Sequence, residues 1–181
     1  MRYGEARPGA ASNTTGREDR MNGKTKRIIR LIASLIIPQL AGGIGALFTE
    51  PAVRTWYAGL DKPSFNPPGW IFGPVWTALY IMMGTALFLV WRNGLVDRKT
   101  KIAVALFGIQ MALNLLWSIL FFGMHNPLAG LVDIALLWAF ILATMVAFFP
   151  LSRTAGFLLV PYFLWVSFAS LLNYMLWSMN R

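Results

Sequence analysis

The chain has 181 residues, of which 57% are apolar and only 13% are charged, and its mean hydropathy is +0.57. An ordinary soluble domain has roughly 25% charged residues, so the composition excludes that class and indicates a membrane protein. The formal charge is +9, and the absence of cysteine excludes disulfides, thiolate metal ligands and cysteine nucleophiles.

Residues 1–27 are polar, basic and poor in aromatic side chains, and we expect this tail to be disordered. The remaining residues, 28–181, are predicted to form one domain. They contain five apolar runs, each long enough for a hydrocarbon core of about 30 Å, which takes about 20 helical residues. The runs lie at roughly 28–48, 70–91, 102–122, 128–149 and 155–177.

The five runs show no strict alternation of apolar and polar residues, so helices are favoured over barrel strands. Short connections after the second run force neighbouring helices to be antiparallel. The predicted fold is therefore an all-α membrane protein, a single five-transmembrane-helix bundle. No internal repeat is visible, and with an odd helix count this disfavours an inverted-repeat transporter.

Positive charge is concentrated in two parts of the chain. Residues 1–30 hold eight Lys and Arg, and further basic residues follow the second and fourth runs, at Arg92, Arg98, Lys99, Lys101 and Arg153. The positive-inside rule then predicts a multi-pass protein whose N-terminus is cytoplasmic if the membrane is a plasma membrane. Topology and attraction to anionic membrane lipid account for the basic tail, so no nucleic-acid partner is predicted.

Small residues recur at helical spacing in the first and third runs. The pairs are Ala41 with Gly45, Gly42 with Ala46, and Gly108 with Ala112. Such pairs allow helices to approach closely. Packing inside one bundle and formation of a homodimer explain them equally well.

The segment 62–76 is the most distinctive part of the chain, with four prolines and several aromatic residues at the entrance to the second run. Proline fixes φ and disfavours αR in the residue before it, so residues 62–68 are not helical, whereas Pro74 fits a first helical turn. A stiff loop costs little entropy to order over a ligand. We expect the 49–69 loop to form a lid through Pro63, Phe65, Asn66, Pro67 and Pro68.

Three runs carry polar or aromatic stripes on one helical face. These are Gln110, Asn114, Trp117 and Phe121 in the third run; Trp76, Tyr80 and Met83 in the second; and Trp165, Ala169, Leu172 and the adjacent Asn173 in the fifth. Buried amides need partners, so the stripe of the third run faces the bundle interior or another subunit. The stripes serve either as contacts between helices or as the lining of a ligand pocket.

Trp138 also lies too deep for an interfacial belt. Asp133 is either an interfacial, hydrogen-bonded carboxylate or a functional intramembrane one. His125, in the turn before Pro127, is expected to be solvated rather than an axial haem ligand. Without a carboxylate pair, a nucleophile triad or metal-spaced ligands, the sequence supports neither hydrolysis nor metal catalysis and requires no cofactor.

Several ordered motifs together resemble the TspO/MBR family, the tryptophan-rich sensory proteins related to the mitochondrial translocator protein, also called the peripheral benzodiazepine receptor. The resemblance covers about residues 33–178. The motifs are Trp56-Tyr57, the 62–70 segment, Trp76 to Tyr80, Gln110 to Gly123, Asp133, Pro161 to Trp165, and Leu172 to Tyr174.

This resemblance implies a five-helix bundle that binds porphyrins such as protoporphyrin IX, as well as synthetic isoquinoline-carboxamides and benzodiazepines. It implies that Trp76 and Trp165 are the two pocket tryptophans linked to light-dependent porphyrin degradation. Gln110 and Asn114 match polar pocket positions, Tyr57 and Trp117 match pocket or lid aromatics, and Ala169 matches a small residue tied to ligand response. The cholesterol motif of mitochondrial relatives fails here, because six residues separate Tyr174 from Arg181.

The predicted function is an integral membrane receptor or sensor for porphyrins and other lipophilic ligands in a tryptophan-lined pocket under the 49–69 loop. The alternatives are a light-dependent porphyrin-degrading enzyme and a transporter of porphyrins or other lipophiles. The expected ligand-binding residues are Tyr57, Trp76, Tyr80, Gln110, Asn114, Trp117, Trp138, Trp165, Ala169 and Asn173.

Overall fold

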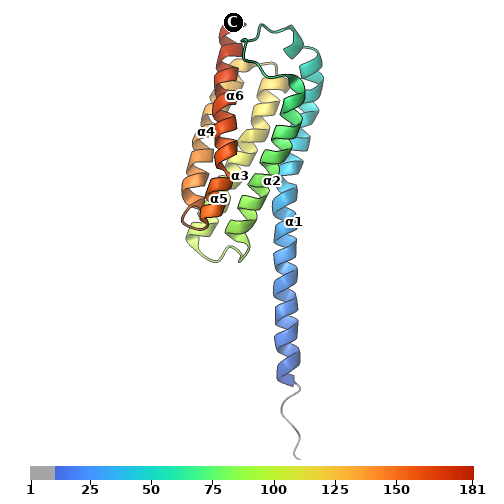
Figure 1. Ribbon diagram of the computed structural model, residues 1–181, viewed down its shortest axis with the longest axis vertical. Coiled ribbons are helices and arrows are strands. Elements are labelled where there is room, and N and C mark those ends of the chain that lie inside the picture. Colours follow the sequence, from blue (N-terminus) through green and yellow to red (C-terminus); the bar gives the residue numbers. More distant parts are fainter. Residues whose placement is uncertain (1–10) are drawn as a thin grey trace, which may run out of the picture.

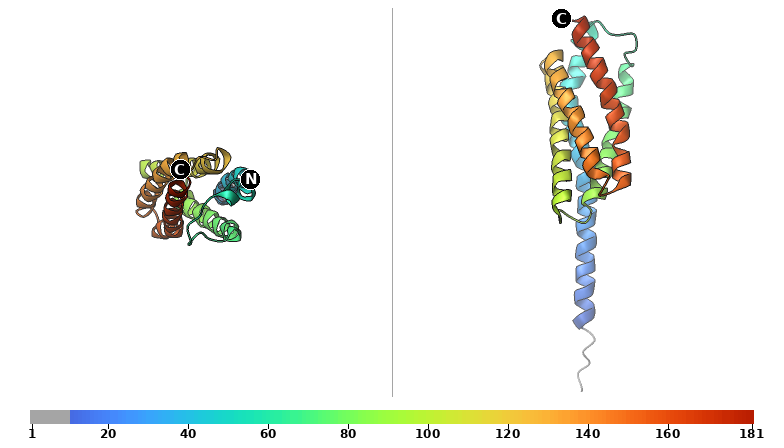
Figure 2. Two further views of the ribbon diagram at one scale, coloured as in Figure 1. Left: turned by 90° about the horizontal axis from the view of Figure 1, so that it is seen from above. Right: turned by 90° about the vertical axis from the view of Figure 1, so that its left-hand side faces the viewer.

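The computed structural model describes residues 11–181, with side chains from residue 22 onward. Within this part of the chain, five helical segments are long and apolar enough to cross a membrane: Asn22–Arg54, Gly69–Trp91, Arg98–Gly123, Pro127–Phe148 and Arg153–Met179. They pack side by side as one bundle (Figures 1 and 2). The predicted all-α, five-helix membrane fold is confirmed.

The first helix, α1 (Ala11–Arg54), is longer than predicted at both ends. Its N-terminal part extends well beyond the bundle (Figure 1). Residues 1–10 lie outside the described residues, but residues 11–27 are helical, which corrects the expectation of disorder there. Once the apolar span has nucleated a helix, each further residue adds a backbone hydrogen bond at little cost, so helix continues where the apolar residues stop.

Helix α2 (Phe72–Trp91) follows a loop that holds two short 3₁₀ turns, η1 (Tyr57–Gly59) and η2 (Gly69–Ile71). Residues 61–68 contain no helix, and Pro74 lies in the first turn of α2. Both observations agree with the conformational limits of proline. The loop is shorter than expected because α1 does not end until Arg54.

Capping side chains fix the starts of the next three helices. Asp97 accepts hydrogen bonds from the backbone N–H and hydroxyl of Thr100, at 2.8 and 2.9 Å, at the start of α3 (Arg98–Ser118). These bonds lower the pKa of the Asp97 carboxyl. Asn126 caps α4 (Pro127–Phe148) and Ser152 caps α5 (Arg153–Leu158) in the same way.

The fifth span is interrupted where one continuous helix, 155–177, was predicted. It consists of α5 and α6 (Val160–Met179), separated at Leu159. Pro161 sits in the first turn of α6 and has no N–H to continue the hydrogen bonding of α5. The break therefore comes from this proline, and the pair still crosses the membrane as one segment.

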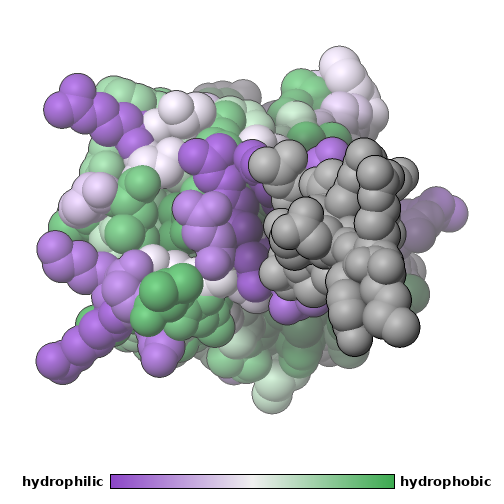
Figure 3. All heavy atoms as spheres, turned by 90° about the horizontal axis from the view of Figure 1, so that it is seen from below, coloured by the Kyte–Doolittle hydropathy of each residue, from purple (hydrophilic) through white to green (hydrophobic). Residues whose placement is uncertain are grey.

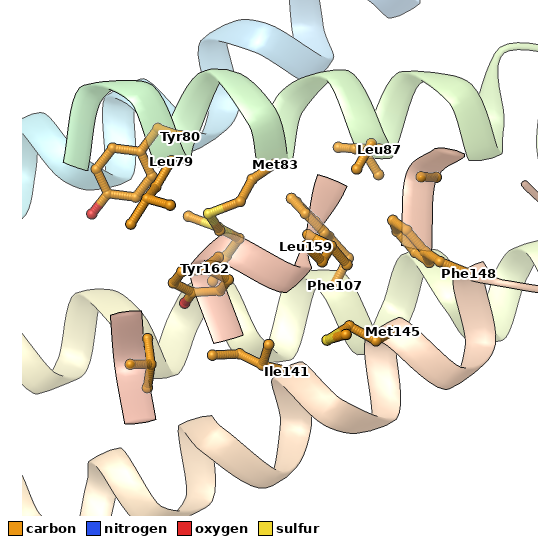
Figure 4. Packing of buried hydrophobic residues seen from close by; sticks show 14 of the residues in the cluster. Leu79, Tyr80, Met83, Leu87, Phe107, Ile141, Met145, Phe148, Leu159 and Tyr162 are labelled. Carbon is orange, nitrogen blue, oxygen red and sulfur yellow. The ribbon is translucent and has the colours of Figure 1, made fainter. Parts of the chain in front are cut away.

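The main hydrophobic core lies between α2, α3, α4 and the α5–α6 pair, with Met83, Ile141 and Tyr162 fully enclosed (Figure 4). Helix α1 packs against α2 and α3 at the side of this core. The approach to α2 is close at Gly84, where an added Cβ would lie 2.5 Å from the Ser34 carbonyl oxygen. The small residues of α1 therefore serve packing inside the bundle, at least at Gly42 and Gly45, which face Tyr80 and Ser118.

On α3, in contrast, Gly108 and Ala112 are exposed, and no atom lies within 4 Å of a Cβ added at Gly108. Packing inside the bundle does not account for this pair. Homodimer formation through this face stays a prediction.

The ends of the helices give a direct test of topology. We call the end that holds Arg30 and Arg92 the basic end, and the end that holds residues 55–68 the loop end. Single cysteines at Lys24 and Val96, both exposed at the basic end, should react with an impermeant thiol reagent from one side of the membrane. A cysteine at the exposed Ser64 should react from the other side, and labelling of all three from one side would contradict the five spans.

Candidate functional site

A cavity of about 620 Å³ opens at the loop end between α1, α2, α3 and α6, beneath residues 57–69. Its volume falls within the ~300–1,000 Å³ typical of small-molecule sites. Aromatic side chains dominate the lining: Tyr57, Phe72, Trp76, Tyr80, Trp117, Phe121, Phe122 and Trp165. The site is therefore suited to a large, flat, mainly apolar ligand.

Tyrosine and amide side chains form a hydrogen-bonded chain across the inner end of the cavity. The Tyr80 hydroxyl donates to Asn114 Oδ1 at 2.9 Å, and Asn114 Nδ2 donates to the Tyr162 hydroxyl oxygen at 3.1 Å. This chain links α2, α3 and α6. Asn114 thus joins helices and lines the cavity at once.

A second pair of hydrogen bonds holds Trp117 in place. Its Nε1–H donates to Asn173 Oδ1 at 3.0 Å, while Asn173 Nδ2 donates to the Pro127 carbonyl at 2.8 Å. The Trp117 ring stacks on Phe121, with centroids 5.1 Å apart and planes at 18°. This wall of the cavity is therefore rigid before any ligand arrives.

Two further tryptophans of the cavity lining, Trp76 and Trp165, are held by contacts with other aromatic rings. Trp76 lies 5.3 Å from Tyr80, and Trp165 meets Phe72 edge-on at 5.9 Å. The Trp165 Nε1–H is buried and has no hydrogen-bond partner among the described residues. A buried unpaired donor is rare, and in a cavity wall it is available to a ligand acceptor.

The end of α3 changes to a π-helix, η3 (Ile119–Gly123). Two consecutive residues of this turn, Phe121 and Phe122, line the cavity. Such π-bulges are frequent at functional sites.

The loop over the cavity is fastened at several points. The Tyr57 hydroxyl donates to Asn66 Oδ1 at 2.7 Å, and Asp61 exchanges two hydrogen bonds of 2.9 Å with Asn180 at the end of α6. Burial raises the pKa of Tyr57, so its hydroxyl stays protonated and remains a donor at physiological pH. The loop is thus a fixed cover.

The predicted lid residues have different positions in this cover. Asn66 and Pro67 line the cavity. Pro63 is buried away from it, Phe65 packs edge-on against Phe168 at 6.2 Å, and Pro68 is exposed. Only part of the proline-rich segment can therefore touch a ligand.

Most of the predicted ligand-binding residues are brought together around the cavity: Tyr57, Trp76, Tyr80, Asn114, Trp117, Trp165, Ala169 and Asn173. Gln110 is not among the lining residues. It lies one turn below Asn114, fully buried, and its amide atoms have no hydrogen-bond partner among the described residues. Trp138 is on α4, which does not line the cavity, and its Nε1–H donates to Ser167 at 2.8 Å on the outer surface.

Asp133 is buried, only 4% exposed, and Oδ2 has no hydrogen-bond partner among the described residues. It does not line the cavity. His125 is exposed and adopts a positive φ of 52°, and its ring stacks on Trp56 at 4.7 Å. Among the described residues, no group of histidine or acidic side chains could hold a metal ion.

The α1 wall of the cavity was not anticipated from the sequence. It is formed by Gln39, Gly42, Gly43, Gly45, Ala46, Thr49, Glu50, Val53 and Arg54. Among these residues are the small side chains Gly42, Gly45 and Ala46, whose spacing predicts close helix contacts. At the rim, Arg54 donates to Glu50 at 2.7 Å, and both side chains are largely exposed.

Fold and site together define a class, a five-helix integral membrane protein with an aromatic cavity under an extramembrane loop. The family model described as TspO/MBR family matches residues 34–178. The chain therefore belongs to the TspO/MBR family.

Its relatives span bacteria and animals. It is 50% identical over 155 residues to the tryptophan-rich protein TspO of Chlorobaculum tepidum, covering 86% of this chain and 98% of the relative. It is 40% identical over 147 residues to the human translocator protein, covering 81% of this chain and 87% of the relative. It is 39% identical over 125 residues to the tryptophan-rich sensory protein of Cereibacter sphaeroides, covering 69% of this chain and 77% of the relative.

Proposed function

We propose that the protein is a membrane receptor or sensor that binds porphyrins of the protoporphyrin IX type, and other flat lipophilic molecules, in the aromatic cavity. The observation that carries this proposal is the lining itself, in which Trp76 and Trp165 share a cavity of about 620 Å³ with six further aromatic residues. Stacking and apolar burial would supply affinity. The names of relatives, a sensory protein and a translocator protein, are compatible with this role.

The polar groups of the cavity would orient the ligand. At the inner end, Asn114 is already hydrogen-bonded on both sides, so it offers little to a guest. At the rim, the exposed Arg54 guanidinium pairs with Glu50 and can meet a ligand carboxylate with its remaining N–H donors. We therefore place the porphyrin propionates at the rim and the macrocycle between the tryptophans.

The direct test is titration of the purified protein with protoporphyrin IX while intrinsic tryptophan fluorescence is followed in the dark. Saturable quenching at one porphyrin per chain is the expected result, and linear quenching without saturation would contradict the proposal. The same sample under illumination distinguishes the enzyme, which would consume the porphyrin. Counterflow in vesicles distinguishes the transporter.

Arg54→Gln should weaken protoporphyrin IX binding by roughly three- to tenfold, because a charge-assisted contact to a propionate is lost. The dimethyl ester of the porphyrin, which has no carboxylate, should bind both forms equally. Arg98→Gln removes the same charge at the basic end and serves as the matched control. If Arg54→Gln weakens the binding of protoporphyrin IX and of its dimethyl ester equally, the placement of the propionates at the rim is contradicted.

Pro68→Ala tests whether loop stiffness contributes to binding. Pro68 is exposed and does not line the cavity, so its replacement removes no ligand contact and no hydrogen-bond donor. Freeing φ at one position typically costs about 0.4–1 kcal/mol, which predicts a two- to fivefold loss of affinity. The ligand-free melting temperature should fall by no more than about 2–4 °C, because the ordered loop also contributes to folding; a drop there with unchanged affinity would instead make the loop a structural clamp.

A further inference from the structure

A second hollow lies on the outside of the bundle, between α1 and α2. It is shallow and open on its outer side, and it is lined by Leu35, Ile36, Gln39, Leu40 and Ile81. Four of these side chains are apolar, and Ile36, Leu40 and Ile81 are exposed. The groove lies within two membrane spans, so its surroundings are hydrocarbon.

The basic end of the same two helices brings two arginines together. Arg30 of α1 donates from Nη1 to the Arg92 carbonyl at 2.9 Å, which places its guanidinium over the end of α2. The chain turns against it at Gly94, where an added Cβ would lie 3.1 Å from Arg30 Nη2. The Arg92 side chain is exposed.

Little negative charge opposes these arginines. Among the side chains described at this end, from residues 22–34, 88–104 and 146–160, Asp97 is the one carboxylate, and it is engaged by Thr100. The ion pair that the structure records is at the loop end, between Arg54 and Glu50. Seen from below, hydrophilic side chains gather over much of the basic end (Figure 3).

Spacing along the helices relates the arginines to the groove. At a rise of ~1.5 Å per residue, Leu35 and Leu40 lie ~8–15 Å from Arg30 along α1. At about 100° per residue they are turned ~140° and ~80° from Arg30 in opposite directions, so it is the reach of the guanidinium over the end of α2, and not a shared face of α1, that brings Arg30 to the groove. Ile81 lies ~16 Å from Arg92 along α2, after about three full turns, so both are on nearly the same face. One leaflet of the hydrocarbon core is ~15 Å thick, so the arginines are at headgroup level when the groove is at acyl-chain level.

We propose that this groove and the two arginines form a binding site for one anionic phospholipid of the leaflet at the basic end. The phosphate would lie between the guanidiniums of Arg30 and Arg92, which suit phosphate oxygens, and one acyl chain would follow Leu35, Leu40 and Ile81. Gln39 lines both this groove and the aromatic cavity. A bound lipid would therefore contact the wall of the ligand site.

The test compares phosphatidylglycerol and phosphatidylcholine of identical chains, added to the full-length protein in non-ionic detergent and counted by native mass spectrometry. One phosphatidylglycerol should bind about tenfold more tightly than phosphatidylcholine. Arg92→Gln should remove that preference, because it deletes the exposed guanidinium without touching the Arg30 hydrogen bond to the backbone. Arg98→Gln, which removes the same charge nearby, should retain it.

Filling the groove tests the acyl-chain half of the site. Ile81→Trp should weaken the binding of both lipids several-fold. Val132→Trp, on the exposed face of α4, should leave the affinity for both lipids unchanged. Melting temperatures confirm that each variant is folded. Equal loss in Arg92→Gln and Arg98→Gln would show diffuse attraction to charge, and displacement of the lipid by millimolar inorganic phosphate would show an anion site without a lipid; either result overturns the proposal.

Discussion

Gly84→Ala is expected to lower the melting temperature of the ligand-free protein by several degrees. The new Cβ would lie 2.5 Å from the Ser34 carbonyl oxygen and 2.9 Å from Leu35 Cα. These are backbone atoms, so no side-chain rotation relieves the clash and α1 must move away from α2. Overpacking of this kind costs about 1–3 kcal/mol, which corresponds to roughly 2–4 °C per kcal/mol for a chain of this size.

Gly73→Ala, on the same helix, is the matched control. No atom lies within 4 Å of its added Cβ, and alanine is about 1 kcal/mol better than glycine within a helix. Its melting temperature should be unchanged or slightly higher. If Gly84→Ala melts like the control in thermal scans of the detergent-solubilised protein, the close approach of α1 and α2 is incorrect.

Replacing Trp76 and Trp165 together with alanine should weaken protoporphyrin IX binding by roughly several hundredfold. Central aromatic anchors in a binding site commonly contribute 2 kcal/mol or more each, and a factor of ten corresponds to about 1.4 kcal/mol. The two rings line the cavity, and Trp165 also presents its unpaired Nε1–H. Porphyrin absorbance gives the affinity without relying on the deleted tryptophans.

Trp138→Ala is the control for this pair. It removes a tryptophan of similar depth whose ring packs against Phe163 outside the cavity. Affinity should stay within about twofold of the parent protein. A comparable loss in Trp138→Ala, or unchanged affinity in the double variant, would place the porphyrin elsewhere.

The five spans were predictable because a bilayer demands length and apolar composition, and both can be read from a sequence. Helix ends were less predictable. Hydropathy falls near residue 48, yet α1 continues to Arg54, because a helix already formed does not need apolar side chains to continue in water. The π-turn at Ile119–Gly123 has no residue signature that periodicity would detect.

Helical periodicity predicted which side chains face inward but not how deep the cavity reaches. Gln110 shares a face with Asn114, yet the cavity closes at the level of Tyr80 and Asn114, one turn before it. Trp138 was expected inside because its position along the span is deep, whereas its direction is outward. Depth along a helix and direction around it are independent, and only packing partners from other helices fix both.

The bond between Asp61 and Asn180 joins positions 119 residues apart. During synthesis on the ribosome, the loop therefore emerges long before its anchor on α6 exists. The aromatic cavity stays uncovered until the α5–α6 span has entered the bilayer and packed against the other helices. Ligand retention should consequently appear only once α6 has docked, and translation intermediates stalled before residue 180 should insert into the membrane yet release porphyrin quickly.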